Sequence, residues 1–158
     1  MAEKREGDMI VNLQKIPAFQ EIPGIKIKQV HPCDMEAVVA FIREQFSEGW
    51  VGEARYAMMR DPVKCFIAVE NGRIVGFSCY DSSAKDFFGP IGVHPDMRER
   101  GVGNALMLRT LHAMKEYGYG YAVIGWVGPA EFYEKTVGAR FIEGGTPENS
   151  VYRRLISM

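Results

Sequence analysis

The chain has 158 residues, of which 47% are hydrophobic and 25% are charged, and its formal net charge is −1 at neutral pH. This size and composition are typical of a single globular domain with enough apolar material for a core. A nearly neutral chain has no general attraction for nucleic acid or an anionic membrane, and no apolar run is long enough to span a bilayer, so neither is expected as a partner.

The start of the chain carries mixed charges over residues 1–8 and lacks the apolar stretch of a signal peptide. We therefore expect these residues to form a flexible tail and the protein to be cytoplasmic. Cys33, Cys65 and Cys79 have no CxxC spacing, which fits reduced thiols in that compartment. The histidines are scattered as well, so no metal site is expected.

Two short strands are predicted before the first helix. Residues 9–13 can form an extra strand within an N-terminal extension over residues 9–23, which ends where Pro23 and Gly24 break the chain. Residues 25–30 alternate apolar and polar side chains, which is typical of a strand with one solvated face.

Two helices are predicted next. Asp34 is expected to cap the first, whose apolar stripe at helical spacing consists of Met35, Val38, Val39, Ile42 and Phe46. Residues 47–52 interrupt the pattern, and a shorter second helix is expected over residues 53–60.

The middle of the chain predicts three consecutive strands. Residues 65–69 are apolar throughout, Asn71-Gly72 is a strong two-residue hairpin turn, and residues 74–80 return antiparallel. A loop over residues 81–85 leads into a third strand that ends at Val93.

The remaining elements alternate. A long helix is predicted over residues 104–115, a strand over residues 121–126 and a short helix over residues 130–136, followed by closing strands over residues 140–142 and 151–156. This order indicates an α/β fold in which helices cover a mixed sheet.

The most informative motif is the glycine turn before the long helix, Arg98-Glu99-Arg100-Gly101-Val102-Gly103. The first N–H groups of a helix have no partner within the helix, and the helix dipole adds positive charge there. Gly101 and Gly103 let pyrophosphate oxygens approach the main chain, and Arg98 and Arg100 add donors suited to phosphate. The motif therefore predicts a site for a phosphorylated ligand.

From about Gly24 to its end, the chain resembles the GCN5-related N-acetyltransferase (GNAT) family. The family's cofactor motif, Gln/Arg-x-x-Gly-x-Gly/Ala, matches Arg98, Gly101 and Gly103, and the aromatic-Tyr pair of a later short helix matches Phe132-Tyr133. The resemblance implies one acetyltransferase domain over residues 1–158, with a mixed, mostly antiparallel twisted sheet of about six to seven strands and about four helices.

The resemblance also implies an activity. GNAT proteins transfer an acetyl group from acetyl-CoA to an amine without a metal, here to a primary amine of an unknown, small-molecule acceptor that attacks the thioester directly. Tyr133 would act as the general acid toward the leaving thiolate. Two groups would hold the cofactor: Ile91, Gly92 and Val93 beside the pantetheine arm, and Arg98, Arg100, Gly101, Val102, Gly103 and Asn104 around the pyrophosphate.

The acceptor side departs from the family pattern. The strand position where some members carry a catalytic Glu is Phe87 here, next to Asp86, and the Asn that many members place before the tyrosine helix is replaced by glycines and Trp126 in residues 125–128. A carboxylate base on that strand is therefore not expected.

The loop between the first two helices usually contributes to the acceptor site in this family. Glu48 and Trp50 are therefore candidate substrate residues, with Glu53 as the neighbouring carboxylate, since an aromatic ring and carboxylates suit a cationic amine. Trp126, at the end of the strand predicted over residues 121–126, is a further candidate. The alternative is that the tryptophan closes the core and the carboxylates are solvated.

Three further questions stay open at this stage. The missing Glu and Asn leave room for a non-enzymatic, regulatory acyl-CoA-binding module on the same fold, and no feature excludes another acyl donor or a hydroxyl acceptor. Tyr133 is either the acid or a core aromatic. Dimers are common in the family, so a homodimer is an option, formed through the N-terminal segment or the last strand.

Overall fold

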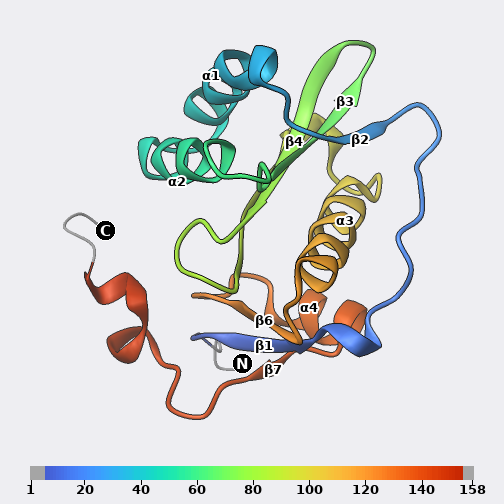
Figure 1. Cartoon of the computed structure of the whole chain (residues 1–158). Coiled ribbons are helices and arrows are strands. Elements are labelled where there is room, and N and C mark those ends of the chain that lie inside the picture. The colour runs from blue at the N-terminus through green and yellow to red at the C-terminus, as the bar shows by residue number, and fades with distance from the viewer. Residues whose placement is uncertain (1–5, 155–158) are drawn as a thin grey trace.

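The computed structural model describes residues 6–154, and its strands form one sheet in the order β2-β3-β4-β5-β6-β1-β7 (Figure 1). Neighbouring strands run antiparallel except β5 and β6, which are parallel. The strands are β1 (Met9–Asn12), β2 (Lys26–Gln29), β3 (Cys65–Glu70), β4 (Arg73–Tyr80), β5 (Phe87–Val93), β6 (Tyr121–Ile124) and β7 (Arg140–Phe141).

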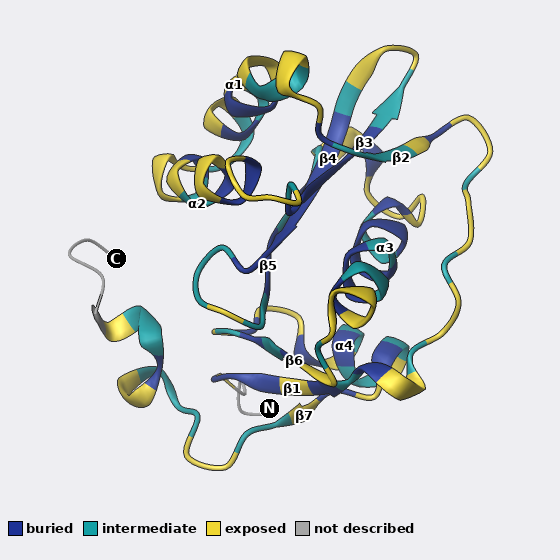
Figure 2. Cartoon of the chain, in the orientation of Figure 1, coloured by how far each residue is buried: buried dark blue, intermediate teal, exposed yellow. Residues whose placement is uncertain are grey.

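Helices cover both faces of this sheet. They are α1 (Met35–Gln45), α2 (Glu48–Met58), α3 (Val102–Tyr117) and α4 (Ala130–Val137). One buried apolar cluster joins α3 and α4 to the sheet, and a second joins α1 and α2 to β3 and β4 (Figures 1 and 2). The expected mixed, mostly antiparallel sheet with about four helices is thereby confirmed.

The central hairpin, β3 and β4, has the structure that its apolar strand and its Asn-Gly turn predicted. On β3, Phe66 and Ala68 face the α3 cluster while Cys65 and Ile67 face the α1–α2 cluster, so a strand covered on both faces is apolar throughout. The β3–β4 turn has positive φ angles at both central residues, 50° at Asn71 and 75° at Gly72, which is the backbone that Asn-Gly favours.

The first helix begins directly after Asp34, as predicted, but the Asp34 side chain does not cap it, and the start of the second helix differs from the prediction. Asp34 ends a 3-10 turn, and its Oδ2 accepts hydrogen bonds from Lys28 Nζ at 2.8 Å and from the His31 N–H at 3.0 Å instead of capping α1. The second helix begins at Glu48, not at residue 53, because the Ser47 hydroxyl accepts the Trp50 N–H at 3.2 Å and caps it.

The chain ends also differ from the prediction. The strand expected over residues 151–156 is a 3-10 helix, Val151–Arg154, and residues 155–158 lie outside the described residues. The tail expected over residues 1–8 ends before Asp8, which is buried. Its N–H donates to the Gly145 carbonyl at 2.7 Å, and its Oδ1 accepts the Trp126 N–H at 2.8 Å. Residues 1–5 lie outside the described range.

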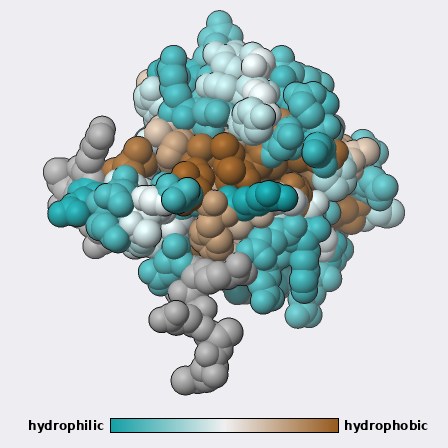
Figure 3. Space-filling model, turned by 90° about the horizontal axis from the view of Figure 1, so that it is seen from below, coloured by the Kyte–Doolittle hydropathy of each residue, from teal (hydrophilic) through white to brown (hydrophobic). Residues whose placement is uncertain are grey.

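The N-terminal extension is part of the sheet. Strand β1 lies between β6 and β7; it pairs with β6 along its whole length and with β7 at Met9 and Ile10. Seen from below, on the side of β1 and β7, the surface shows hydrophobic residues across its middle with hydrophilic residues around them (Figure 3). A homodimer stays a prediction.

The parallel pair in the middle of the sheet is short. Strand β5 meets β6 only where Phe87 and Phe88 face Val123 and Ile124. Beyond Phe88, β5 continues along β4 to Val93 without β6 beside it. Most of β5 therefore has one main-chain edge that no neighbouring strand occupies.

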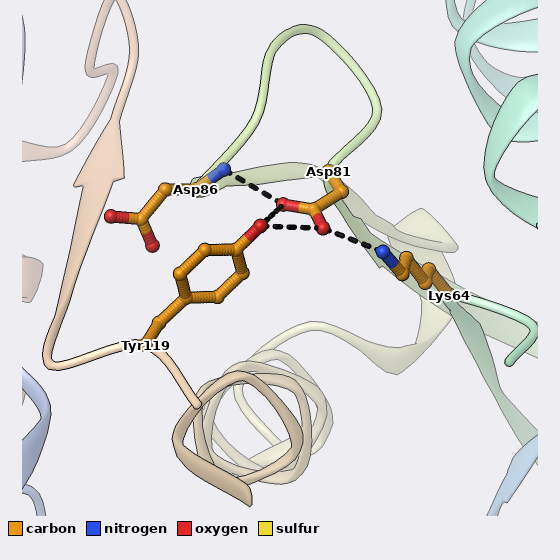
Figure 4. A network of polar contacts seen from close by, with 4 residues as sticks. All are labelled: Lys64, Asp81, Asp86 and Tyr119. Carbon is orange, nitrogen blue, oxygen red and sulfur yellow. Dashed lines mark hydrogen bonds and ion pairs between the residues drawn. The ribbon is translucent and has the colours of Figure 1, made fainter. Parts of the chain in front are cut away.

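A buried polar network holds this junction together (Figure 4). One oxygen of Asp81 forms an ion pair with Lys64 Nζ at 2.7 Å, and both oxygens lie within 2.9 Å of the Tyr119 hydroxyl, which donates to the carboxylate. The Asp86 N–H donates to Asp81 Oδ1 at 2.7 Å, and the Asp86 carbonyl accepts the Val123 N–H at 2.9 Å. The network thus joins β3, β4, β5 and β6.

Asp86 is the unfavourable member of this network. Its side chain points away from Asp81 (Figure 4), and its Oδ1 is buried without a hydrogen-bond partner among the described residues. Burial, and then the nearby Asp81 charge, raise the pKa of Asp86 to about 6. Because the unfolded carboxyl titrates near pH 3.8, the folded protein holds a proton that the unfolded chain has lost between these two values.

We predict that Asp86→Asn raises the free energy of unfolding at pH 8 by about 1–2 kcal/mol, since it removes a charge that the fold disfavours and that solvent partly screens. The gain should shrink as pH falls from about 6 toward 4, where Asp86 is protonated in the folded wild type. Urea titrations at pH 4, 6 and 8 measure this. Glu44→Gln, at an exposed carboxylate of α1, is the control, and a gain independent of pH would contradict the prediction.

Candidate functional site

A cavity of about 860 Å³ lies where β5 and β6 separate. It is bordered by the first turns of α2, the second half of β5, the start of α3, the segment that follows β6, and α4. Its lining residues are Ser47, Gly49, Trp50, Glu53, Phe88, Gly89, Pro90, Ile91, Gly92, Val93, Gly103, Ile124, Gly125, Trp126, Val127, Gly128, Pro129, Phe132, Tyr133 and Tyr152.

The end of β5 and the start of α3 form one wall of this cavity. Ile91, Gly92, Val93 and Gly103, all expected at the cofactor, line it together. A Cβ added at Gly103 would meet only Val93 Cγ2, at 3.7 Å, so this point of the helix N-terminus has free space in front of it. A Cβ at Gly92 would instead lie 2.5 Å from the Phe46 ring, so this glycine allows α1 to pack closely on β5.

The other residues of the glycine turn lie outside the large cavity. Gly101, with a φ of 79°, and Asn104 line a second cavity of about 350 Å³ beside residues 17–22. Arg98 is exposed, and Val102 is buried in the core. Arg100 pairs with Glu70, with Nη2 and Oε2 2.7 Å apart. Because this pair is exposed, it contributes little stability and leaves Arg100 able to exchange partners.

Tyr133 lies on α4 with its ring buried between Phe88 and Phe132. The ring centroids are 6.2 Å from Phe88 and 5.3 Å from Phe132, both in edge-to-face geometry. Burial raises the pKa of Tyr133 to about 12, and no hydrogen bond found within residues 6–154 uses its hydroxyl. The hydroxyl is therefore protonated at neutral pH and can donate a hydrogen bond to a group in the cavity.

Two of the three candidate substrate residues line the same cavity. Trp50 packs against Phe46 and Phe77, with ring centroids 5.2 Å and 5.8 Å apart, so it both closes the core and lines the cavity. Trp126 lines the cavity too, 42% exposed and with a φ of 45°. This backbone is strained for a bulky residue, and it is held by the hydrogen bond from the Trp126 N–H to Asp8.

Glu48 does not join them. Its carboxylate forms an exposed ion pair with Arg43, with Oε1 2.5 Å from Nε, and it does not line the cavity. The hydrogen bond from Arg43 lowers the pKa of Glu48. One turn further along α2, Glu53 takes the place in the cavity wall that the sequence suggested for Glu48.

Glu53 belongs to a polar group that sequence analysis missed. The Ser83 hydroxyl donates to Glu53 Oε1 at 2.5 Å, and the Tyr152 hydroxyl donates to Ser83 Oγ at 3.1 Å. The Ser82 hydroxyl donates to the Glu53 carbonyl at 2.6 Å. Nothing in the sequence marks Ser83, and Tyr152 was expected in a strand, so their meeting with Glu53 depends on the folded chain.

Two classes of feature were not found in the part of the chain that the structure describes. No three His, Cys, Asp or Glu side chains are grouped in a way that could hold a metal ion there. None of its helices combines the length and apolar character needed to cross a membrane.

Comparison with known proteins gives a family match over part of the chain. The family model described as Acetyltransferase (GNAT) domain matches residues 61–136. This segment contains the hairpin, β5, the glycine turn, α3 and most of α4. No curated protein matches the sequence significantly.

Several solved structures share the fold. A GCN5-related glucosamine N-acetyltransferase region of a fungal multi-domain GH3 β-N-acetylglucosaminidase has a TM-score of 0.70 and 18% identity, over 85% of this chain and 19% of that chain. A GCN5-related N-acetyltransferase from Sphaerobacter thermophilus has a TM-score of 0.70 and 23% identity, over 85% and 47%. A GNAT-family protein from Novosphingobium aromaticivorans has a TM-score of 0.60 and 17% identity, over 87% and 61%.

The chain spans less than half the length of the first two of these structures. At such identities the likeness shows the fold, while the family model adds the sequence pattern of residues 61–136. Residues 61–136 therefore match the GNAT domain, and this match confirms the family resemblance predicted from the glycine turn and the Phe132-Tyr133 pair, which both lie within it.

Proposed function

We propose that the chain is an acetyl-CoA-dependent N-acetyltransferase that acts on a primary amine of a small molecule. The observation that carries this proposal is the single cavity shared by Gly103 at the start of α3, the free edge of β5 and Tyr133. A phosphorylated ligand at the helix start would extend along β5 toward the tyrosine, and the far wall of the cavity would receive the acceptor.

The residues present fit coenzyme A. The first N–H groups of α3 have no partner within the helix and face an open point at Gly103. Unpaired main-chain groups of β5 can bind the amide groups of a pantetheine arm. The second cavity, at Gly101 and Asn104, offers space for a further part of the ligand on the other side of the helix start. Arg98 and Arg100 supply positive charge.

The acetyl thioester supplies an activated acyl group, and the chain supplies positions and protons. A main-chain N–H near the end of β5 would stabilise the charge that develops on the carbonyl oxygen. The Tyr133 hydroxyl, protonated up to a pKa of about 12, would donate to the sulfur as its bond to carbon breaks. Orientation of amine against thioester would contribute much of the remaining rate.

The activity is tested by adding acetyl-CoA and a panel of primary amines and measuring thiol release, after a thermal shift with acetyl-CoA alone. A rise in melting temperature with acetyl-CoA, and thiol release with at least one amine, are expected. Tight binding without turnover of any amine would favour a non-enzymatic acyl-CoA-binding module instead.

We predict that Tyr133→Phe lowers kcat by about 10²–10⁴-fold, the usual contribution of a general acid, because the hydroxyl acts on the departing sulfur. The dissociation constant of acetyl-CoA should stay within about twofold. Steady-state thiol release and calorimetry measure the two quantities. Tyr121→Phe, at a tyrosine that is 55% exposed, is the control, and wild-type turnover in Tyr133→Phe would rule out the acid role.

We predict that Gly103→Glu abolishes acetyl-CoA binding, because it places bulk and negative charge in front of the α3 N-terminus, where phosphate would bind. A calorimetric titration should show at least a 100-fold loss of affinity. Gly120→Glu serves as the matched control, since a side chain at Gly120 meets nothing within 4 Å. Unchanged affinity in Gly103→Glu would refute this placement of the ligand.

A further inference from the structure

We call the part of the cavity lined by Trp50, Glu53, Trp126 and Tyr152 the acceptor wall. It holds a carboxylate without a counter-ion. Glu53 is half-buried and lines the cavity, and none of the ion pairs formed by the described residues includes it. Its Oε1 accepts from Ser83, whereas no hydrogen bond found in residues 6–154 uses Oε2. A partly desolvated carboxylate of this kind is costly until a cation or a further donor meets it.

The surroundings of Glu53 suit a cation that carries an organic group. Trp50 lies one helical turn before it and lines the same cavity, as expected for residues three apart on one helix face. Trp126 and Tyr152 complete the wall, with ring centroids 5.8 Å apart. Aromatic faces attract ammonium groups, and these three rings and one carboxylate line the same cavity as Tyr133.

The hydroxyl groups of Ser83 and Tyr152 fix the orientation of the Glu53 carboxylate. Tyr152 donates to Ser83, which donates to Glu53 Oε1, and Ser82 holds the Glu53 main chain. Oε1 of Glu53 is therefore held by Ser83, whereas Oε2 has no hydrogen-bond partner among residues 6–154. Such support is what a group needs if it is to meet a reacting atom at a defined place.

Resting on the proposed N-acetyltransferase function, we propose that Glu53 is the acceptor-side catalytic residue: its carboxylate binds the ammonium group of the acceptor amine and takes the protons that this nitrogen loses. Ser83 and Tyr152 are positioning residues for that carboxylate. The substrate class that follows is a small primary amine with an apolar or aromatic body, which the tryptophans would contact.

The proton balance uses groups already described. Glu53 takes one proton from the ammonium and passes it to solvent, which leaves a neutral amine. The amine lone pair forms the C–N bond to the thioester carbon, and the C–S bond then breaks with its electron pair on sulfur. The second nitrogen proton goes to Glu53 and the Tyr133 proton goes to sulfur. Glu53 then returns its proton, through solvent, to Tyr133, so the net products are an amide, a thiol and one released proton.

The charges around Glu53 agree with this role. Burial raises the pKa of Glu53, and the hydrogen bond from Ser83 partly offsets the rise, which brings the carboxyl closer to the pKa of an amine. The titratable groups that sense its charge are the Cys79 thiol on β4 and the Tyr152 hydroxyl. Burial raises the pKa of each, so both are neutral at neutral pH and neither competes for the cation.

The test uses the full chain with acetyl-CoA and four amines: butylamine, putrescine, benzylamine and phenethylamine. Turnover is followed by thiol release, and binding of each amine to the protein–CoA complex is followed by calorimetry. We predict that Glu53→Gln lowers kcat by about 10²–10⁴-fold and weakens amine binding at least tenfold, while acetyl-CoA affinity is unchanged. Glu48→Gln, on the same helix but outside the cavity, should behave as wild type.

A second variant guards against a merely structural effect. The kcat/KM of the wild type should fall as pH drops through the Glu53 pKa, because a protonated carboxyl cannot accept a proton. Ser83→Ala removes the hydrogen bond that lowers this pKa, so the acidic limb should move to higher pH, and Glu53→Gln should lack that limb. A loss of folding alone would not shift the limb.

The outcomes separate this inference from the proposed function. Wild-type turnover of an amine with an unaffected Glu53→Gln, or an acidic limb that Ser83→Ala leaves in place, would overturn the role of Glu53 and leave the N-acetyltransferase standing. A wild type that acetylates no primary amine, neither these four nor any other of the wider panel, would overturn both.

Discussion

The buried carboxylate of Asp81 is the interaction on which the middle of the molecule depends. It forms an ion pair with Lys64 and accepts hydrogen bonds from the Tyr119 hydroxyl and the Asp86 N–H. The Asp86 carbonyl in turn accepts a hydrogen bond from the Val123 N–H of β6. Removing one partner of such a buried pair typically costs about 3–5 kcal/mol, because the other charge is left uncompensated. The network therefore fixes the point at which β5 and β6 meet, and the two-residue length of their pairing sets where they separate.

The separation of β5 from β6 makes room for the cavity and positions the residues of its cofactor side. It leaves an edge of β5 free, places the start of α3 beside that edge, and puts the Tyr133 ring of α4 against Phe88. The same loop that carries Asp81 continues to Ser82 and Ser83, which bind α2 through Glu53. One short segment, residues 81–83, thus connects the Asp81 network to the acceptor wall, so the geometry of that wall depends on the junction.

Local signals in the sequence predicted the features that local physics controls. Asn71-Gly72 has the backbone of its turn, β3 is apolar because both of its faces are covered, and the glycine turn precedes a helix as expected. The start of α2 was missed although its signal is local, because Ser47 lies only three residues before the Trp50 N–H that it accepts. Two further features depend on distant partners. Asp8 accepts hydrogen bonds from Trp126 and Ser150, and the hydroxyl of Tyr152, on the 3-10 helix Val151–Arg154, reaches Ser83. No periodicity within a single segment reports such contacts.

The junction also offers a physical reason for Phe87 at the strand position where some GNAT proteins carry a catalytic Glu. Phe87 lies on β5, where it pairs with β6 at the junction, so a carboxylate there would add a third carboxyl group to a junction that already holds Asp81 and Asp86. Like charges in one low-dielectric region raise each other's free energy, and Asp86 already shows that cost in its raised pKa. Placing the acceptor-side carboxylate on α2 removes it from this cluster and lets hydroxyl groups, which carry no charge, orient it. The junction that opens the cavity is thus also a reason for its base to come from the opposite wall.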